Sequence, residues 1–213
     1  MVPQQDRAEA TRRRIVSAGV ALFGDAGFGM VDMVDVISLA GVSKGACYYH
    51  FPTKQSLAAA IVEESSARIA AAMAPIWESA APAMHRLIIA TFRFLELVET
   101  DDTTRIGYQL RQAVKQNGEP GTRHFADTEM VFRDALKRAV KDGHLRADTN
   151  VSQTAYTLLT ALVGCQLLAE PFGDAPRTRF AGVWEVVLRG ISTDDRLSAL
   201  EQVVRSASRK QPT

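Results

Sequence analysis

Helix start and stop signals crowd into the first sixty residues of this chain, and their spacing limits the fold more than any other feature. Asp32, Ser43 and Thr53 are good N-cap residues, each followed by a short segment with helical spacing of its apolar residues. Gly41 and Pro52 are typical of residues that end helices. The sequence therefore predicts four helices in quick succession, over residues 6–24, 32–40, 44–49 and 53–73.

The rest of the chain has the same helical character. Pro75 is expected to end the fourth helix, and Gly and Pro residues predict a loop over residues 117–121. No segment alternates between apolar and polar residues in the manner of a strand. We expect six further helices, over residues 82–99, 104–116, 127–142, 151–170, 176–190 and 193–208.

Composition excludes several classes of protein. A hydrophobic content of 46% is enough for a real core, and a formal net charge of +1 gives no global attraction to nucleic acid, so any DNA contact needs a local basic patch. The two cysteines, Cys47 and Cys165, fall in separate helical regions, which fits a reducing compartment. No signal peptide and no apolar run of about 18 residues is evident, so we expect a cytoplasmic protein without a membrane partner.

The segment from Asp32 to Tyr49 has the geometry of a helix-turn-helix. Two short helices are joined by a tight glycine-containing turn, so the second helix can project into a DNA major groove. Ser43 at its start leaves backbone N–H groups facing outward, which suits a phosphate oxygen. Lys44 is its first charged side chain, and Gly45 and Ala46 are small enough for the backbone to approach base edges.

Three polar aromatic residues follow one another at the end of this helix. Tyr48, Tyr49 and His50 cannot all point into a core, because successive helical side chains turn by about 100°. At least one of them must face outward. The alternative to a DNA contact is that both tyrosines are half-buried anchors between helices and that His50 is a solvated surface residue.

The sequence around this helix resembles the signature of the TetR family of repressors. The resemblance is ungapped over residues 40–57, AGVSKGACYYHFPTKQSL, and extends over about residues 7–64 through Thr11, Ile15, Ala18, Ala21, Leu22, Phe23, Gly27 and Phe28. It implies an all-α fold of about nine or ten helices. Residues 1–53 would form the helix-turn-helix DNA-binding domain, and residues 54–213 a helical-bundle ligand-binding and dimerisation domain.

The resemblance also implies how DNA is bound. The partner would be a double-stranded operator with an imperfect palindrome, held by a homodimer whose recognition helices enter successive major grooves about 34–36 Å apart. By position, Lys44, Gly45, Ala46 and Tyr49 would lie near bases, and Tyr48, His50, Thr53 and Lys54 near phosphates, in addition to the phosphate that the helix start at Ser43 suits. Phe51 would belong to the core.

Three charged features qualify this assignment. Lys54 lies in the first turn of its helix, where a cation opposes the helix dipole unless an anion is bound nearby. Asp32 stands where many relatives carry threonine, and we expect its charge to be occupied by capping. The run from Arg12 to Arg14 is a candidate additional cationic patch, although such a run is by default a solvated helix face.

The second half is predicted from its apolar helix faces. The helices over residues 151–170 and 176–190 are apolar on more than one face, so they need burial on two sides. The resemblance implies that they build a four-helix dimer interface, and the alternative is a thick core within one chain. Candidate effector-pocket residues, polar or aromatic side chains on apolar helix faces, are Phe92, Tyr108, Gln109, Phe132, Thr160 and Gln166.

A finer resemblance connects this chain with the γ-butyrolactone receptor branch of the family. It rests on the segment from Ser43 to Phe51, on Leu162-Val163-Gly164 and on Leu188-Arg189-Gly190-Ile191. That branch carries a tryptophan on the helix expected from residue 127, and this chain has none there. A pseudo-receptor that senses another metabolite therefore remains an alternative to a butyrolactone receptor.

An enzyme is not expected. The four histidines lie far apart, and neither a phosphate-binding glycine loop nor a nucleophile motif is present. We expect no cofactor and no metal. The remaining alternative is a DNA-binding protein that responds to no ligand, whereas the main hypothesis is a repressor that a small molecule releases from its operator.

Overall fold

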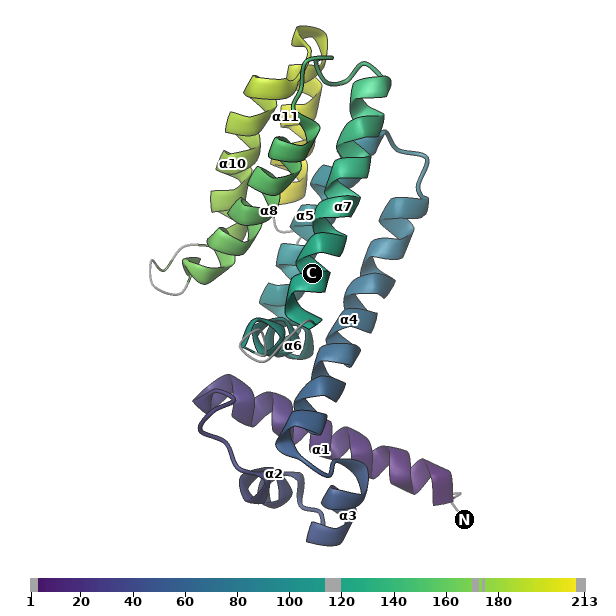
Figure 1. Ribbon diagram of the computed structural model, residues 1–213, viewed down its shortest axis with the longest axis vertical. Helices are drawn as coiled ribbons and strands as arrows, with labels where there is room; N and C mark the ends of the chain where they lie inside the picture. Colours follow the sequence, from purple (N-terminus) through teal and green to yellow (C-terminus); the bar gives the residue numbers. More distant parts are fainter. Residues whose placement is uncertain (1–3, 114–119, 170–172, 174, 210–213) are drawn as a thin grey trace. The chain divides into compact units, whose positions relative to one another are not determined.

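Ten α-helices form the part of the chain that this computed structural model describes, residues 4–113, 120–169, 173 and 175–209 (Figure 1). They are α1 (Gln4–Ala26), α2 (Met33–Ala40), α3 (Lys44–His50), α4 (Lys54–Glu78), α5 (Ala83–Thr100), α6 (Asp102–Ala113), α7 (Pro120–Lys141), α8 (Val151–Leu167), α10 (Pro176–Ile191) and α11 (Asp194–Ser208). These described residues contain no strand, only one isolated antiparallel bridge between Leu145 and Ser192. None of their helices is long and apolar enough to cross a membrane. The expected all-α class is confirmed.

Packing divides the chain into two compact units. The first comprises Met1–Ala71 and Leu97–Gly118, and the second comprises Ala72–Glu96 and Glu119–Thr213. Helices α4 and α5 each contribute to both units. The functional boundary expected after residue 53 stays a prediction, because these units are defined by contacts alone.

The core of the first unit collects apolar side chains from short helices. Ile15 of α1, Val36 of α2 and Cys47 of α3 are fully buried, together with Leu57 of α4. Gly19 lets α1 pack closely on α4, since a Cβ at this position would lie 3.0 Å from Leu57 Cδ2. Figure 1 shows α1, α2 and α3 grouped around the first turns of α4.

The core of the second unit is larger and comes from α5, α7, α8, α10 and α11. Trp184 is fully buried there, and its indole N–H donates to the Thr91 hydroxyl over 3.1 Å. At one end, the Arg146 N–H donates to the Ile191 carbonyl over 2.8 Å, which fixes the loop after α7 to the junction of α10 and α11.

Two expected helix boundaries are wrong. Helix α4 continues to Glu78 with Pro75 inside it. Proline removes one backbone donor, but here the last turn is held by other contacts: Trp77 packs on the second core, and Arg86 donates to the Trp77 carbonyl over 2.8 Å.

Helix α7 begins at Pro120 instead of Asp127. Proline fits the first turn of a helix, where its missing N–H has no intrahelical partner in any case. Of the loop expected over residues 117–121, positions 117–119 lie outside the described residues, and Pro120 and Gly121 are helical.

Candidate nucleic-acid interface

The turn between α2 and α3 is fixed by local geometry and by one long-range contact. Gly41 ends α2 in the left-handed conformation, with φ of 61°, which glycine adopts without strain. The Arg14 guanidinium donates to the Gly41 carbonyl over 2.8 Å. The angle at which α3 leaves α2 is therefore tied to α1.

Helix α3 starts at a capped N-terminus and turns one side chain inward. The Ser43 hydroxyl accepts from the Ala46 N–H at 3.2 Å, which confirms Ser43 as the cap. Cys47 faces the core with no exposed surface, and burial raises the pKa of its thiol. At about 100° per residue, Gly45 and Tyr49 lie on the opposite face of the helix.

The aromatic residues of α3 differ in their exposure. Tyr49 is 80% exposed and Tyr48 is 38% exposed, whereas Phe51 is buried. The prediction that the three polar aromatic residues cannot all face the core is confirmed. The Tyr49 and His50 rings meet nearly edge to face, with centroids 5.2 Å apart. The exposed tyrosine ring therefore has one aromatic contact that favours its orientation.

Gly45 stands in open space. A Cβ built there would meet no atom within 4 Å, so packing within the chain does not require glycine at this position. Together with Lys44 and Tyr49, both exposed, it forms an outward surface that we call the α3 face. The face combines a cation, an aromatic ring and a bare backbone, a combination suited to the floor of a DNA major groove.

Lys54 has partners within the chain. Its ammonium donates to the Phe28 carbonyl over 2.9 Å and to the Val31 carbonyl over 2.8 Å, and it lies 4.7 Å from the centroid of the Phe28 ring. These contacts explain a lysine at a helix start without a bound anion. Two of the three ammonium protons are engaged, and the contact with a DNA phosphate stays a prediction.

Thr53 also makes local hydrogen bonds. The Ser56 N–H donates to the Thr53 hydroxyl over 3.0 Å, and the Thr53 N–H donates to the Ser56 hydroxyl over 3.1 Å. This reciprocal pair resembles a capping box and fixes the start of α4 beside α3. A phosphate contact by Thr53 stays a prediction as well.

The N-terminal arginines have different surroundings. Arg14 binds the Gly41 carbonyl, and the Arg12 guanidinium lies 5.6 Å from the centroid of the Phe51 ring, whereas Arg13 is exposed. At the other cap, the Asp32 N–H donates to the Asp35 carboxylate over 3.0 Å, as expected for an acidic residue three positions into a helix.

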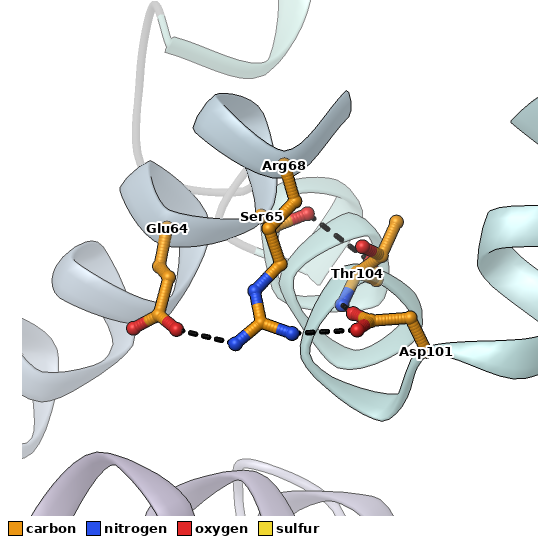
Figure 2. A network of polar contacts seen from close by, with 5 residues as sticks. All are labelled: Glu64, Ser65, Arg68, Asp101 and Thr104. Atoms are coloured by element: carbon orange, nitrogen blue, oxygen red, sulfur yellow. Dashed lines mark hydrogen bonds and ion pairs between the residues drawn. The ribbon is translucent and has the colours of Figure 1, made fainter. Parts of the chain in front are cut away.

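A polar network joins α4 to the start of α6 within the first unit (Figure 2). Arg68 binds Glu64 on its own helix at 2.6 Å and Asp101, just before α6, at 2.5 Å. Burial alone would raise the pKa of Asp101, but hydrogen bonds from Thr104 and Arg68 outweigh it and lower that pKa. The hydrogen bond to Glu64 raises the pKa of Arg68.

Backbone contact reinforces this network. The Ser65 hydroxyl donates to the Thr104 carbonyl over 3.1 Å, and a Cβ on Gly107 would lie 2.3 Å from Ser65 Cβ. Helices α4 and α6 therefore pack with almost no side chain between them. Ile106 of α6 also packs closely against Gly24 of α1. A Cβ built on Gly24 would lie 3.1 Å from Ile106 Cδ1.

The candidate effector-pocket residues do not form one cluster. Phe92 and Phe132 belong to the core of the second unit, Thr160 is exposed, and Tyr108 and Gln109 belong to the first unit, the former buried and the latter exposed. Gln166 is half-buried, and both of its amide atoms are buried without a hydrogen-bond partner. A buried amide without partners costs free energy, which makes Gln166 the strongest of these candidates for contact with another molecule.

Helices α8 and α10 pack on each other and leave apolar side chains in solvent. Tyr156 and Leu167 of α8 are 58% and 59% exposed, and Val186 of α10 is 71% exposed. We call the exposed residues of these two helices the α8–α10 face. Their inner faces fill the second core, whereas their outer faces stay exposed in the single chain, so burial on a second side stays a prediction.

These features define a class: a helix-turn-helix DNA-binding regulator with a second, helical unit. Comparison with known proteins gives the family. Residues 15–61 match the model of the bacterial regulatory proteins of the TetR family, and residues 81–193 match the tetracycline-repressor-like C-terminal domain. The chain belongs to the TetR family of transcriptional regulators, a family of regulators and not of enzymes.

Individual relatives extend the comparison. The A-factor receptor protein of Streptomyces griseus is 24% identical over 89% of this chain and 66% of its own length, just under two thirds. The regulator UidR of Escherichia coli K12 is 26% identical over 89% of this chain and 96% of its own. A solved γ-butyrolactone receptor, described as ArpA-like, superposes with a TM-score of 0.81 at 26% identity, covering 95% of this chain and 98% of that one.

One similar structure contains DNA. CprB of Streptomyces coelicolor in complex with its operator sequence superposes with a TM-score of 0.79 at 26% identity, covering 95% of this chain and 98% of that one. Like the other members of its family, the present chain is a DNA-binding regulator.

Sequence reasoning missed the contacts that orient this site. Nothing in the local sequence pairs Arg14 with the Gly41 carbonyl or Lys54 with the loop before α2, since 27 and 26 residues separate the partners. The network of Arg68 and Asp101 had one available signal, an acidic residue immediately before a helix start.

Proposed function

We propose that this chain represses transcription as a homodimer, by placing its two α3 faces in successive major grooves of an imperfectly palindromic operator. The single observation that carries this is the α3 face: Gly45 and Tyr49 lie on the side of α3 opposite Cys47, and Lys44 is exposed in the first turn of the helix. Similarity to CprB, which was solved in complex with its operator sequence, supports binding to operator DNA. The protein would act in the cytoplasm, at the nucleoid while bound to DNA.

The roles of individual side chains are part of the proposal. Lys44, Gly45, Ala46 and Tyr49 would lie near base edges, and Ser43, Tyr48, His50, Thr53 and Lys54 near the phosphates that fix register. The partners already made by Thr53 and Lys54 limit them to a secondary part in phosphate binding.

The effector is proposed to be a small apolar molecule, with γ-butyrolactones as the class to test. Similarity to the A-factor receptor protein and to a γ-butyrolactone receptor structure supports this choice. Phe92, Phe132, Thr160 and Gln166 of the second unit are the candidate contact residues, and Gln166, with its buried amide without partners, is the first of them to test. Helix α7 carries no tryptophan, so another side chain would have to cover the ligand.

Effector binding is proposed to act through α4. This helix begins beside α3, belongs to both units, and is clamped to α6 by Arg68, Asp101 and Gly107. A shift of α4 would change the separation of the two recognition helices, and a ligand can do this only if it binds better to the DNA-incompetent state.

The test starts from duplexes that the protein selects from a random pool. Binding is measured by fluorescence anisotropy, with and without a panel of γ-butyrolactones. We expect sequence-selective binding and release by at least one lactone. Absence of selective binding contradicts the DNA-binding proposal. Selective binding that no lactone weakens contradicts only the effector class.

A further inference from the structure

A groove in the second unit lies apart from α7 and α8. It has a volume of about 670 Å³ and is lined by α5, the first turn of α10 and α11. Ile89, Phe92 and Val203 give it an apolar lining. The volume is within the range of small-molecule sites, on the order of 300 to 1,000 Å³.

The charges around the groove are unbalanced. Three arginines, Arg93, Arg177 and Arg209, line it together with one carboxylate, Glu96. Glu96 is shared, with one oxygen 2.7 Å from Arg93 and the other 3.8 Å from Arg177. His85 also lines the groove, and burial, followed by electrostatic interaction with His144, lowers its pKa.

Arg177 is the central cation of this arrangement. It is only 7% exposed, and its Nη2 donates to the carbonyls of Ala207 and Arg209 at the end of α11, over 2.8 and 3.2 Å. Its Nε is buried and has no hydrogen-bond partner. Arg177 also lies in the first turn of α10, where its positive charge is unfavourable in the field of the helix dipole. A nearby anion would offset this unfavourable interaction and would supply an acceptor for the Nε.

We propose that this groove binds a small amphipathic carboxylate, with the carboxylate at Arg177 and Arg93 and the apolar part along Ile89, Phe92 and Val203. The net positive lining selects a negative charge, and the apolar wall selects a hydrocarbon or aromatic body. A carboxylate could accept from the free Nε while the other donors of Arg177 keep their present partners. The proposal does not depend on the identity of the effector.

The probe is sodium octanoate, titrated into the full-length protein by isothermal calorimetry, with octan-1-ol as its uncharged counterpart. We expect saturable binding of octanoate and an affinity for octan-1-ol lower by about tenfold or more, since a charged hydrogen bond is lost. Equal affinities, or no saturable binding of octanoate, overturn the proposal.

Variants locate the site. Arg177→Gln removes the central cation, and Ser206→Phe fills the groove from an exposed position on α11, so it tests the proposal even if Arg177→Gln does not fold. Each should weaken octanoate binding by about tenfold or more. Arg138→Gln, an exposed arginine of α7 outside the groove, is the control and should bind as the parent does. Unchanged binding by Ser206→Phe would place the octanoate elsewhere and overturn the assignment.

Discussion

The Tyr49 side chain contributes little burial to the stability of the fold, because 80% of its surface stays in water. Lys44, in the first turn of the same helix, has no partner among the hydrogen bonds and ion pairs of the described residues, and a Cβ on Gly45 would meet no atom within 4 Å beyond its own helix backbone. A single exposed side chain is ordinary, but three exposed positions without a packing role on one seven-residue helix are best explained by a partner that covers them.

The first prediction separates base contacts from phosphate contacts. Tyr49→Ala should weaken binding to the selected duplex by about tenfold and leave binding to random DNA nearly unchanged. Lys44→Ala should weaken both and lower the slope of log affinity against log salt concentration by about 1. Anisotropy titrations at several salt concentrations measure both effects.

Lys137→Ala is the control, because this exposed lysine lies on α7 in the second unit. The residue assignment is wrong if both α3 variants bind the selected duplex as tightly as the control at equal salt.

The second prediction uses two glycines in different surroundings. Gly45→Ala should keep or raise the free energy of unfolding, by up to about 1 kcal/mol, because alanine favours helix and nothing crowds its Cβ. It should nevertheless weaken operator binding. Gly107→Ala should lower the free energy of unfolding by about 1–3 kcal/mol, since its Cβ would overlap Ser65.

Denaturant unfolding and anisotropy titrations on the same two variants check this pair. A destabilised Gly45→Ala protein, or one that binds operator normally, would contradict the proposed role of the bare backbone.

The start of α3 and the outward orientation of its tyrosine could be predicted from the sequence, but the hydrogen-bond partners of the basic residues could not. The cap, the turn and the outward tyrosine follow from local rules that act over three or four residues. Lys54 and Arg14 bind carbonyls more than twenty residues away, so their local surroundings in the sequence show only a lysine and an arginine without visible partners.

At the scale of elements, α6 is packed against both α1 and α4. Ile106 and Leu110 belong to the same core as the helix-turn-helix, and Gly107 brings the α6 backbone onto α4. A displacement of α6 would therefore change the packing of α1 and α4, the helices that support α3. The clamp of Arg68 and Asp101 is the polar part of this connection.

The third prediction concerns the pH dependence of that clamp. Since the folded-state pKa of Asp101 lies below its ordinary value of 3.8, its stabilising effect is fully present above that value and is lost as pH falls through the lower folded-state pKa. Asp101→Asn keeps a cap acceptor and removes the charge. At about pH 7 it should lower the free energy of unfolding by about 0.5–1 kcal/mol, because the pair is partly exposed.

Denaturant titrations of parent and variant at equal protomer concentration give the difference at each pH. It should shrink toward zero as the pH falls through the lowered folded-state pKa of Asp101. A difference that stays constant from neutral to acid pH would show that the charge of Asp101 contributes nothing.

The presence and order of the helices could be predicted from the sequence, whereas the end of α4 and the start of α7 could not. Periodicity and caps indicate each of the ten helices, because these signals are local. The last turn of α4 beyond Pro75 depends on Trp77 and Arg86, a tertiary contact. The first turns of α7 precede its apolar pattern, so periodicity alone starts that helix too late.

At the scale of the whole molecule, the α8–α10 face is the apolar surface that a dimer would bury. Its inner side already fills the second core, while Tyr156, Leu167 and Val186 remain more than half exposed. A homodimer that pairs these helices with their equivalents would remove this apolar area from water.

The fourth prediction is that Val186→Asp breaks the dimer. A charge at the centre of an apolar interface should raise the dimer dissociation constant by about 100-fold or more. Sedimentation velocity measures the association state, and operator affinity should fall in parallel. Met130→Asp, an equally simple change at an exposed residue of α7, should remain dimeric. A monomeric parent protein, or a Val186→Asp protein as dimeric as its parent, would contradict the proposed interface.

The candidate effector pocket shows where sequence reasoning ends. Polar residues on apolar faces were chosen one by one, but Thr160 is exposed and Tyr108 packs in the first unit, since the choice among buried, interfacial and solvent-facing positions is made by tertiary packing. Gln166, with its unpartnered amide, keeps the best physical support.

Hydroxyl-radical footprinting of the selected duplex tests the central claim most directly. The account predicts two protected segments related by a two-fold axis, with centres about 34–36 Å apart along the DNA, one for each α3 face of a dimer. Protection at both segments should disappear together in Tyr49→Ala at a concentration that saturates the parent protein. A single protected segment, protection spread evenly over any sequence, or a footprint that Tyr49→Ala leaves unchanged would contradict it.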